Sequence, residues 1–268
     1  MAVSSVVKDS HAITKQKVGT AELLFRSAQE MGLSPSWITP DGLFAVLVDG
    51  REQYVNFARS PLNSHTAASL AKNKYLTRCI LERHEMHNIP FMHPRTLSEA
   101  ELFLECHGKI IAKPITGSGA RDIHIITMPL QLHNVSITNY ILEKYIAGKE
   151  LRYLVLNGSV IGVHRSEYGI SIAEDRQLQR ISYPASEWSP ALISSSLQVA
   201  RILDLKFAAV DYLVDSSGQA YILEVNTTPG LKWFHAPTSG PIVDVAQQFL
   251  AAVFDGSGSQ GGERWNTL

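Results

Sequence analysis

The chain has 268 residues, of which 45% are hydrophobic and 18% are charged, and its formal net charge is −1. This composition is ordinary for a globular protein and allows one large domain or two to three small ones. The near-neutral charge excludes the positive field typical of proteins that bind nucleic acid or anionic membranes. No apolar run approaches a membrane span of about 20 residues, and we expect a cytoplasmic protein.

Helices and strand hairpins are both predicted along the chain. A helix is expected at Ala21–Met31, and the next two strands meet at Asp49-Gly50, a dipeptide typical of tight hairpins. Ser98 and Glu101 have the spacing of a capping box and predict a helix start. Strands with covering helices predict an α+β fold of antiparallel sheets. The other expected elements are Phe44–Val48, Gln53–Phe57, Leu76–His87, Lys109–Lys113, Ile123–Ile126, Tyr140–Tyr145, Leu151–Leu156, Ser159–Val163, a helix capped by Ser189, Phe207–Val214, Ala220–Val225 and Ile242–Phe254.

Polar side chains in apolar surroundings are concentrated in the last predicted hairpin. Glu224 and Asn226 are two residues apart on one strand, so they point to the same face, and Asp211 on the paired strand can share it. Two carboxylates and an amide oxygen suit Mg²⁺ that also holds phosphate oxygens. A solvated strand face is the alternative, but the flanking residues are apolar, and buried carboxylates without a cation are costly.

Two further segments have polar features that suit a nucleotide. Lys113 ends an apolar strand, and the glycine-bearing loop Thr116–Ala120 follows it, so charge and close backbone amides are available to phosphates. The loop lacks the Gly-Lys-Ser/Thr ending of a Walker motif, and a solvent loop is an equal alternative. The hinge after Ile141 can present backbone groups to a flat base, with Glu150 placed to accept ribose hydroxyls. Taken by itself, however, this segment is better explained as a plain strand–turn–strand.

Taken in order, these segments resemble the ATP-grasp superfamily over roughly residues 63–253. Asn73-Lys74 resembles its first lysine motif, where many members have Asp-Lys. Glu143–Ile146 with Glu150 resembles the adenine hinge of D-alanine–D-alanine ligase. The run from Glu224 to Gly230 is similar to the RimK, glutathione synthetase and cyanophycin synthetase group. The resemblance also matches Lys113 with Gly117, Ser118 and Gly119 to the phosphate loop, and Asp211, Glu224 and Asn226 to the magnesium triad.

The resemblance implies two α+β subdomains, residues 66–141 and 142–254, that grip ATP between antiparallel sheets. A shortened N-terminal region, 1–65, precedes them, and a flexible tail, 255–268, follows. Relatives usually have a full-sized N-terminal domain that helps to bind substrate, so the substrate class stays open.

The implied activity is that of an ADP-forming carboxylate–amine ligase. A substrate carboxylate attacks the γ-phosphate of ATP, and an amine captures the acyl phosphate to form an amide or peptide-like bond on a small amino-acid-type substrate. The cofactors are ATP and two Mg²⁺ ions, for which Mn²⁺ is a substitute, and a homodimer is compatible with this interpretation. A phosphotransferase on the same fold and a nucleotide-binding module without turnover are the alternatives.

The resemblance also assigns roles to individual residues. Arg165 is placed on the transferring phosphoryl group or the substrate carboxylate, because a planar guanidinium suits bidentate oxyanion contact. His164 and His235 are candidate bases, although a lone histidine is more often only hydrogen-bonded. The predicted catalytic residues are Arg165, Lys113 and Asn226; the nucleotide-binding residues are Lys74, Lys113, Gly117, Ser118, Gly119, Glu143, Lys144, Tyr145, Ile146 and Glu150; the substrate residues are Arg121, Lys232 and Ser239.

Overall fold

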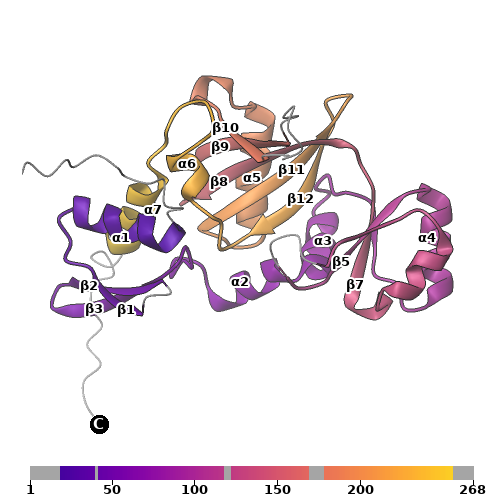
Figure 1. Cartoon of the computed structure of the whole chain (residues 1–268), viewed down its shortest axis with the longest axis horizontal. Helices are drawn as coiled ribbons and strands as arrows, with labels where there is room; N and C mark the ends of the chain where they lie inside the picture. The colour runs from indigo at the N-terminus through magenta and orange to yellow at the C-terminus, as the bar shows by residue number, and fades with distance from the viewer. Residues whose placement is uncertain (1–18, 40–41, 118–121, 169–177, 256–268) are drawn as a thin grey trace, which may run out of the picture.

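Three antiparallel sheets follow one another along the long axis of the molecule (Figure 1). The computed structural model describes residues 19–39, 42–117, 122–168 and 178–255. The predicted flexible tail, 255–268, lies outside these ranges except for its first residue. Within the ranges, no helix combines the length and apolar character that a membrane crossing requires.

The N-terminal sheet packs under helix α1 (Thr20–Glu30) and has the strand order β1-β2-β3, with bounds Ser36–Thr39, Leu43–Val48 and Arg51–Asn56. Asp49 and Gly50 have φ values of 49° and 75°, as a tight primed turn requires, so the predicted hairpin is confirmed. The ring of Phe25 stacks on Trp37 with centroids 4.3 Å apart. Leu24, Phe44 and Val55 belong to one core with the middle sheet, so this region is continuous with the rest of the fold.

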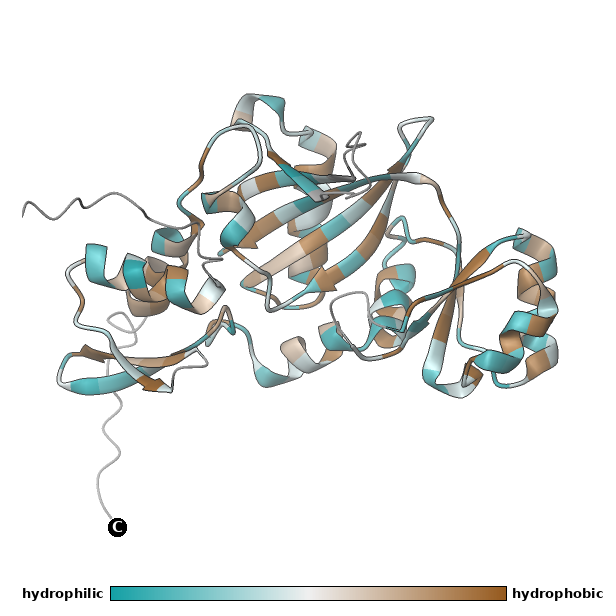
Figure 2. Ribbon diagram, viewed as in Figure 1, coloured by the Kyte–Doolittle hydropathy of each residue, from teal (hydrophilic) through white to brown (hydrophobic). Residues whose placement is uncertain are grey.

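The middle sheet has five strands, and helices cover parts of both faces. Figure 2 shows apolar residues alternating with polar ones along its strands. One face packs on α2 (His65–Lys72), α3 (Lys74–Arg83) and α5 (Pro190–Ile202). The other face meets α6 (Lys232–His235) and α7 (Val245–Asp255). Its spatial order is β10 (Leu178–Ser182), β9 (Ser159–Tyr168), β8 (Gly148–Leu156), β11 (Phe207–Asp215) and β12 (Ala220–Asn226).

The third sheet has the order β4-β7-β5-β6, with bounds Phe91–Met92, Tyr140–Lys144, Ile110–Pro114 and His124–Ile126. Helix α4 (Leu97–His107) packs on one face of it. The prediction that Ser98 caps this helix is wrong. Thr96 is the N-cap and accepts the Glu99 amide at 3.2 Å, while Glu99 accepts the Arg95 amide at 2.7 Å. The Thr96–Glu99 pair has the same spacing and stands two residues earlier, where the chain is still extended.

Packing does not follow the predicted subdomain boundaries. The boundary between residues 141 and 142 falls inside β7. Helices α2 and α3, which the sequence assigned to the first subdomain, contribute Ala67, Ala71 and Leu81 to the core of the middle sheet. The third sheet and α4 form their own smaller core. The α2–α3 segment therefore runs beneath the middle sheet toward the third one (Figure 1).

Both edges of the middle sheet are covered by other parts of the chain. At the β10 edge, the Thr238 amide donates to Arg180 and the Ser182 amide donates to Ser239, at 2.7 and 2.9 Å. Gly240 has a φ of 90°, and a Cβ there would lie 1.9 Å from the Ser182 carbonyl oxygen, so the close approach requires glycine. At the β12 edge, Asn88 forms a parallel bridge with Ile222.

A buried ion cluster joins α3 to the third sheet. Arg78 Nη2 lies 2.7 Å from Glu143 Oε1, and Lys113 Nζ lies 2.6 Å from Glu143 Oε2. Arg78 is only 3% exposed, Lys113 7% and Glu143 1%. Burial alone would raise the pKa of Glu143, but the two cations outweigh it and hold that pKa at about 2. Glu143 is therefore ionised at neutral pH.

This depressed pKa predicts an acid-dependent loss of stability. The contribution of Glu143 is fully present above its unfolded pKa of about 4.5, and it is lost as pH falls toward about 2. A shift of this size corresponds to roughly 3 kcal/mol at neutral pH. Urea unfolding from pH 7 to 3 should show native protein and Glu143→Gln converging as pH falls. The exposed Glu105→Gln is the control, and a native-to-variant gap independent of pH would contradict the assignment.

Candidate active site

Strand pairing places one polar residue from each strand of the middle sheet in a single row. Asp211 pairs with Glu224 on one side and with Arg152 on the other. Arg152 pairs in turn with His164, and His164 with Ser182. Directly paired residues point to the same face, so all five share it. Asn226 pairs with Ala209, two residues before Asp211, and therefore lies on this face as well.

The centre of the row is a bidentate ion pair. Arg152 Nε and Nη2 donate to the two carboxylate oxygens of Asp211, both at 2.7 Å. Asp211 is only 2% exposed, so the arginine compensates a charge that has little contact with water. Burial opposes the charge of Arg152, but Asp211 outweighs it and raises the arginine pKa above its ordinary value. Arg152 is not among the site residues predicted from the sequence, although it lies two residues after Glu150 on the same strand.

Glu224 completes the acidic end of the row. Burial raises the pKa of this carboxyl, Lys74 opposes the shift at an Nζ–Oε1 distance of 3.8 Å, and Asp211 adds to it. The Asn226 side-chain oxygen accepts the Thr228 amide at 2.9 Å. Glu224 and Asp211 are adjacent carboxylates, and a divalent cation between them would relieve their repulsion. Oxygen donors of this kind suit Mg²⁺.

A preformed cage of three acidic, histidine or cysteine ligands is absent from the described residues. The two carboxylates and the amide oxygen of Asn226 would therefore supply only part of a magnesium coordination shell. Magnesium is commonly held by one or two carboxylates together with substrate phosphates and water, so the donor set fits that mode.

The two predicted lysines lie on either side of the glycine-bearing loop. Lys74 opens α3 behind the N-cap Asn73, and its Nζ donates to the Gly117 carbonyl at 2.9 Å. Lys113 reaches the same region from β5 but is held by Glu143. Of the other loop residues assigned to the site, Ser118, Gly119 and Arg121 lie outside the described ranges.

The hinge between β7 and β8 offers backbone, because the side chain of Glu143 is turned into the ion cluster. Glu143 was predicted to belong to the nucleotide-binding hinge, and in the structure its side chain is held by Arg78 and Lys113. Lys144 is exposed, and the Tyr145 amide donates to the Lys109 carbonyl at 3.0 Å. Ile146 follows, half-buried, before β8 begins.

Two isoleucines provide an apolar surface next to this hinge. Ile111 pairs with Glu143 on one side and with Ile125 on the other, so the isoleucines share the face opposite α4. Ile125 is exposed, as a residue that meets a flat ligand would be. Glu150 is on β8, on the face of Arg152, and burial followed by the charge of Asp211 raises its pKa.

Arg165 is on the wrong face for its predicted role. It pairs with Leu151 on β8 and Ile181 on β10, which alternate with Arg152 and Ser182. Its guanidinium carbon lies 5.9 Å from the Tyr183 ring centroid, on the face that α5 covers. Strand alternation therefore separates Arg165 from Asp211, and Arg152 is the arginine that the sheet presents to the carboxylates.

The remaining predicted residues surround the β10 end of the row. Lys232 Nζ lies 4.9 Å from the Trp233 ring, and Arg180 approaches the same ring at 5.9 Å. Ser239 belongs to the segment that pairs with β10, so its backbone is structural. His235 accepts the Ala246 amide at 3.0 Å and thereby helps to fix the start of α7.

His164 is not suited to act as a base at neutral pH. It is 1% exposed and packs on Phe234, with ring centroids 4.8 Å apart. Burial first, and then Arg152 and Arg180, lower its pKa to about 3, so the ring is neutral under ordinary conditions.

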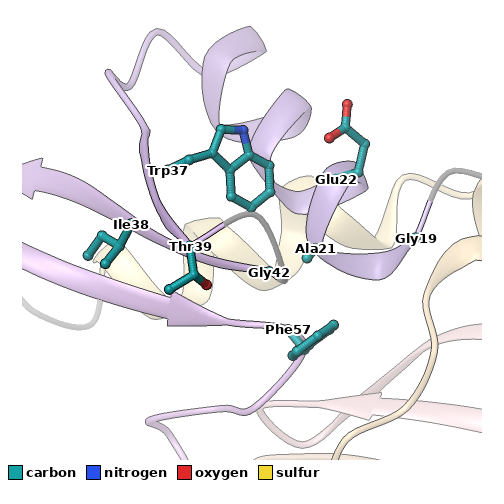
Figure 3. Close-up of a pocket in the computed structure, with 8 residues that line it drawn as sticks. All are labelled: Gly19, Ala21, Glu22, Trp37, Ile38, Thr39, Gly42 and Phe57. Carbon is teal, nitrogen blue, oxygen red and sulfur yellow. The ribbon is translucent and has the colours of Figure 1, made fainter.

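A separate hollow of about 640 Å³ lies in the N-terminal region (Figure 3). Its lining includes Trp37, Ile38 and Phe57, with Glu22 of α1 at its rim. None of the lining residues belongs to the predicted site. The hollow is therefore distinct from the carboxylate row.

Part of the chain is similar in sequence to known ligases. The chain is 29% identical over 143 residues to a D-alanine–D-alanine ligase of Rickettsia canadensis (strain McKiel), a match that covers 45% of this chain and 39% of the relative. It is 29% identical over 118 residues to a probable alpha-L-glutamate ligase of Aeromonas salmonicida (strain A449), with coverage of 44% and 39%. The match thus spans about two fifths of the length of these curated relatives. No protein-family model matches the sequence.

The fold has a similar solved structure that covers almost the whole chain. The ATP-grasp ligase PsnB, complexed with a phosphomimetic variant of its minimal precursor, Mg and ADP, superposes with a TM-score of 0.65 at 14% identity. That match covers 87% of this chain and 94% of PsnB. The predicted α+β fold with antiparallel sheets is confirmed. The chain therefore has the fold of the ATP-grasp ligase PsnB, and over less than half of its length its sequence is similar to those of a D-alanine–D-alanine ligase and a probable alpha-L-glutamate ligase.

Proposed function

We propose that this chain is an ATP-dependent carboxylate–amine ligase that works through an acyl phosphate. The observation that carries the proposal is the row Glu224–Asp211–Arg152, which Lys74 approaches from α3. Acidic residues and a fixed guanidinium lie side by side there, as suits phosphoryl transfer from a magnesium nucleotide to an anionic substrate. Little covalent chemistry is asked of the protein, because positioning and charge neutralisation dominate phosphoryl transfer.

The nucleotide half of the site draws on both the middle and the third sheet. Lys74, Lys113 and the Gly117 loop, with Ser118 and Gly119, would bind the phosphates. The backbone of 144–146 and the Ile111–Ile125 surface would receive adenine, and Glu150 would accept the ribose hydroxyls. Asp211, Glu224 and Asn226 would hold two magnesium ions, whose charge offsets that of the β- and γ-phosphates.

The substrate half lies toward β10. A carboxylate oxygen of the substrate would attack the γ-phosphorus as the bond to the bridging oxygen of ADP breaks. An amine would then attack the acyl carbon and expel phosphate, losing its proton to solvent. Arg152 is suited to the developing negative charge, because its two bonds to Asp211 use only two of the five N–H donors of a guanidinium. Lys232, Ser239 and Arg121 are proposed to line the amino-acid-type substrate.

The magnesium role predicts the behaviour of Asp211→Asn. The substitution keeps the shape of the side chain but removes the charge that a cation and Arg152 both require, so turnover should fall at least about 100-fold. ADP release, measured against amino acids and short peptides with mass detection of products, gives the rate. Circular dichroism and the melting temperature report whether the variant folds. Native-like ADP release by a folded Asp211→Asn would remove this residue from the site.

The acyl-phosphate step predicts that hydroxylamine, offered in place of the amine, traps a hydroxamate from the native enzyme. Arg152→Ala should lower the hydroxamate rate by about 10²–10³, as expected for losing one preorganised charge donor. Arg165→Ala is the matched control on the opposite face, and it should keep most of the rate if its melting temperature is close to native. The opposite ranking of the two arginines would overturn the assignment of Arg152.

The two alternative functions give different results in the same assay. ATP consumption with a phosphorylated product and no hydroxamate would favour a phosphotransferase. Nucleotide binding without ADP release from any substrate would favour a binding module. The mostly buried pair of carboxylates supports turnover. A module that only binds nucleotide does not need the bidentate ion pair between Arg152 and Asp211.

A further inference from the structure

Arg78 connects the parts of the molecule that hold the two ends of the proposed nucleotide site. It lies on α3, is almost fully buried, and contacts three different segments. Its Nε and Nη2 donate to Glu143 on β7, at 3.0 and 2.7 Å. Its Nη2 also donates to the Leu223 carbonyl of β12 at 2.8 Å, and its Nη1 donates to the Ile222 carbonyl.

On the β7 side, Arg78 affects how Lys113 is used. Arg78 and Lys113 share the single carboxylate of Glu143, so the buried cluster carries one unit of excess positive charge. Buried net charge is unfavourable unless an ion of opposite sign completes it. A phosphate group next to Lys113 would do so. Because Arg78 already neutralises much of the negative charge of Glu143, the positive charge of Lys113 is only partly compensated and can attract that phosphate.

On the β12 side, Arg78 holds the strand immediately before Glu224. Ile222 and Leu223 are the two residues that precede this carboxylate, and their carbonyls both accept from the guanidinium. Asn88 completes the clamp, because it accepts from Arg78 Nη1 at 3.1 Å and donates to the Arg78 carbonyl at 3.0 Å. Lys74, four residues earlier on the same helix, approaches Glu224 itself.

We propose that Arg78 is a positioning residue that couples phosphate binding at Lys113 to magnesium binding at Glu224. The proposal rests on the proposed function, since it assigns Lys113 and Glu224 to the nucleotide and its metal. Arg78 touches neither ligand. It fixes Lys113 through Glu143, and it fixes Glu224 through the β12 backbone. A displacement of either residue is therefore transmitted to the other.

The charge of Arg78 and its fork geometry have separable effects. Lysine can neutralise Glu143, but its single ammonium cannot span the carboxylate and two carbonyls at once. In the absence of magnesium, Arg78→Lys should therefore bind ATP with an affinity within about threefold of native. The new lysine still supplies a positive charge beside Glu143, so the charge around Lys113 is unchanged. In Arg78→Lys, magnesium should increase the ATP affinity much less than it does in the native chain. Arg78→Met should lose both the magnesium-free ATP affinity and the increase that magnesium gives.

The experiment is a titration of ATP with and without saturating Mg²⁺, read by calorimetry, for the native chain and each variant. The ratio of the two dissociation constants measures the coupling, and we expect it to fall about five- to tenfold in Arg78→Lys, within the usual range of coupling between sites. Asn88→Ala loosens the clamp without touching Glu143, so it should lower the ratio as well. Arg83→Met, exposed on the same helix, is the control and should leave the ratio unchanged.

Several outcomes distinguish this proposal from the function on which it rests. Folded Arg78→Lys and Asn88→Ala with a native ratio would overturn the coupling and leave the ligase assignment intact. Weaker ATP binding with an unchanged ratio would do the same, since it would show a role in stability or charge alone. A native chain that binds no magnesium nucleotide would overturn both. If Arg78→Met does not fold, Arg78→Lys and Asn88→Ala decide the question.

Discussion

The pairing register of β8, β11 and β12 is the constraint from which the candidate site follows. Side chains alternate along a strand, so a shift of one residue between β11 and β8 would turn Arg152 away from Asp211 and leave a buried carboxylate without its partner. The apolar residues between the polar ones enter the core under α5, which fixes the register by burial. The charges of the site are therefore held in place by the hydrophobic packing of the opposite face.

The shared face of the acidic residues could be predicted from the sequence, whereas the arginine beside them could not. Asp211, Glu224 and Asn226 were identifiable because one hairpin and the two-residue period of a strand determine their common face. The choice between Arg152 and Arg165 depends on the pairing register between neighbouring strands, and the β8–β9 and β11–β12 pairs contain bulges. Local sequence patterns do not predict this register. The ATP-grasp fold was predictable from motif order, whereas the packing of α2 and α3 under the middle sheet depends on contacts distant in sequence.

Glu143 shows the same limit for a single residue. A glutamate at the end of a strand and next to a hinge is typical of a ligand contact, and sequence alone gives no sign that Arg78, 65 residues away, lies against it. Only the folded chain shows that its charge is used internally. In the proposed site the hinge would then contribute its backbone, which tolerates sequence change better than a charged contact would.

The covered edges of the middle sheet have a consequence for the behaviour of the protein at high concentration. An open edge strand presents unpaired amides and carbonyls to other molecules and is a common starting point for intermolecular β-pairing. Here the 238–240 segment forms backbone hydrogen bonds with β10. On β12, Asn88 forms a bridge with Ile222, and Arg78 donates to the Leu223 carbonyl. The segments that close the sheet therefore also act against aggregation, and loosening either one would expose a strand that other copies of the chain can extend.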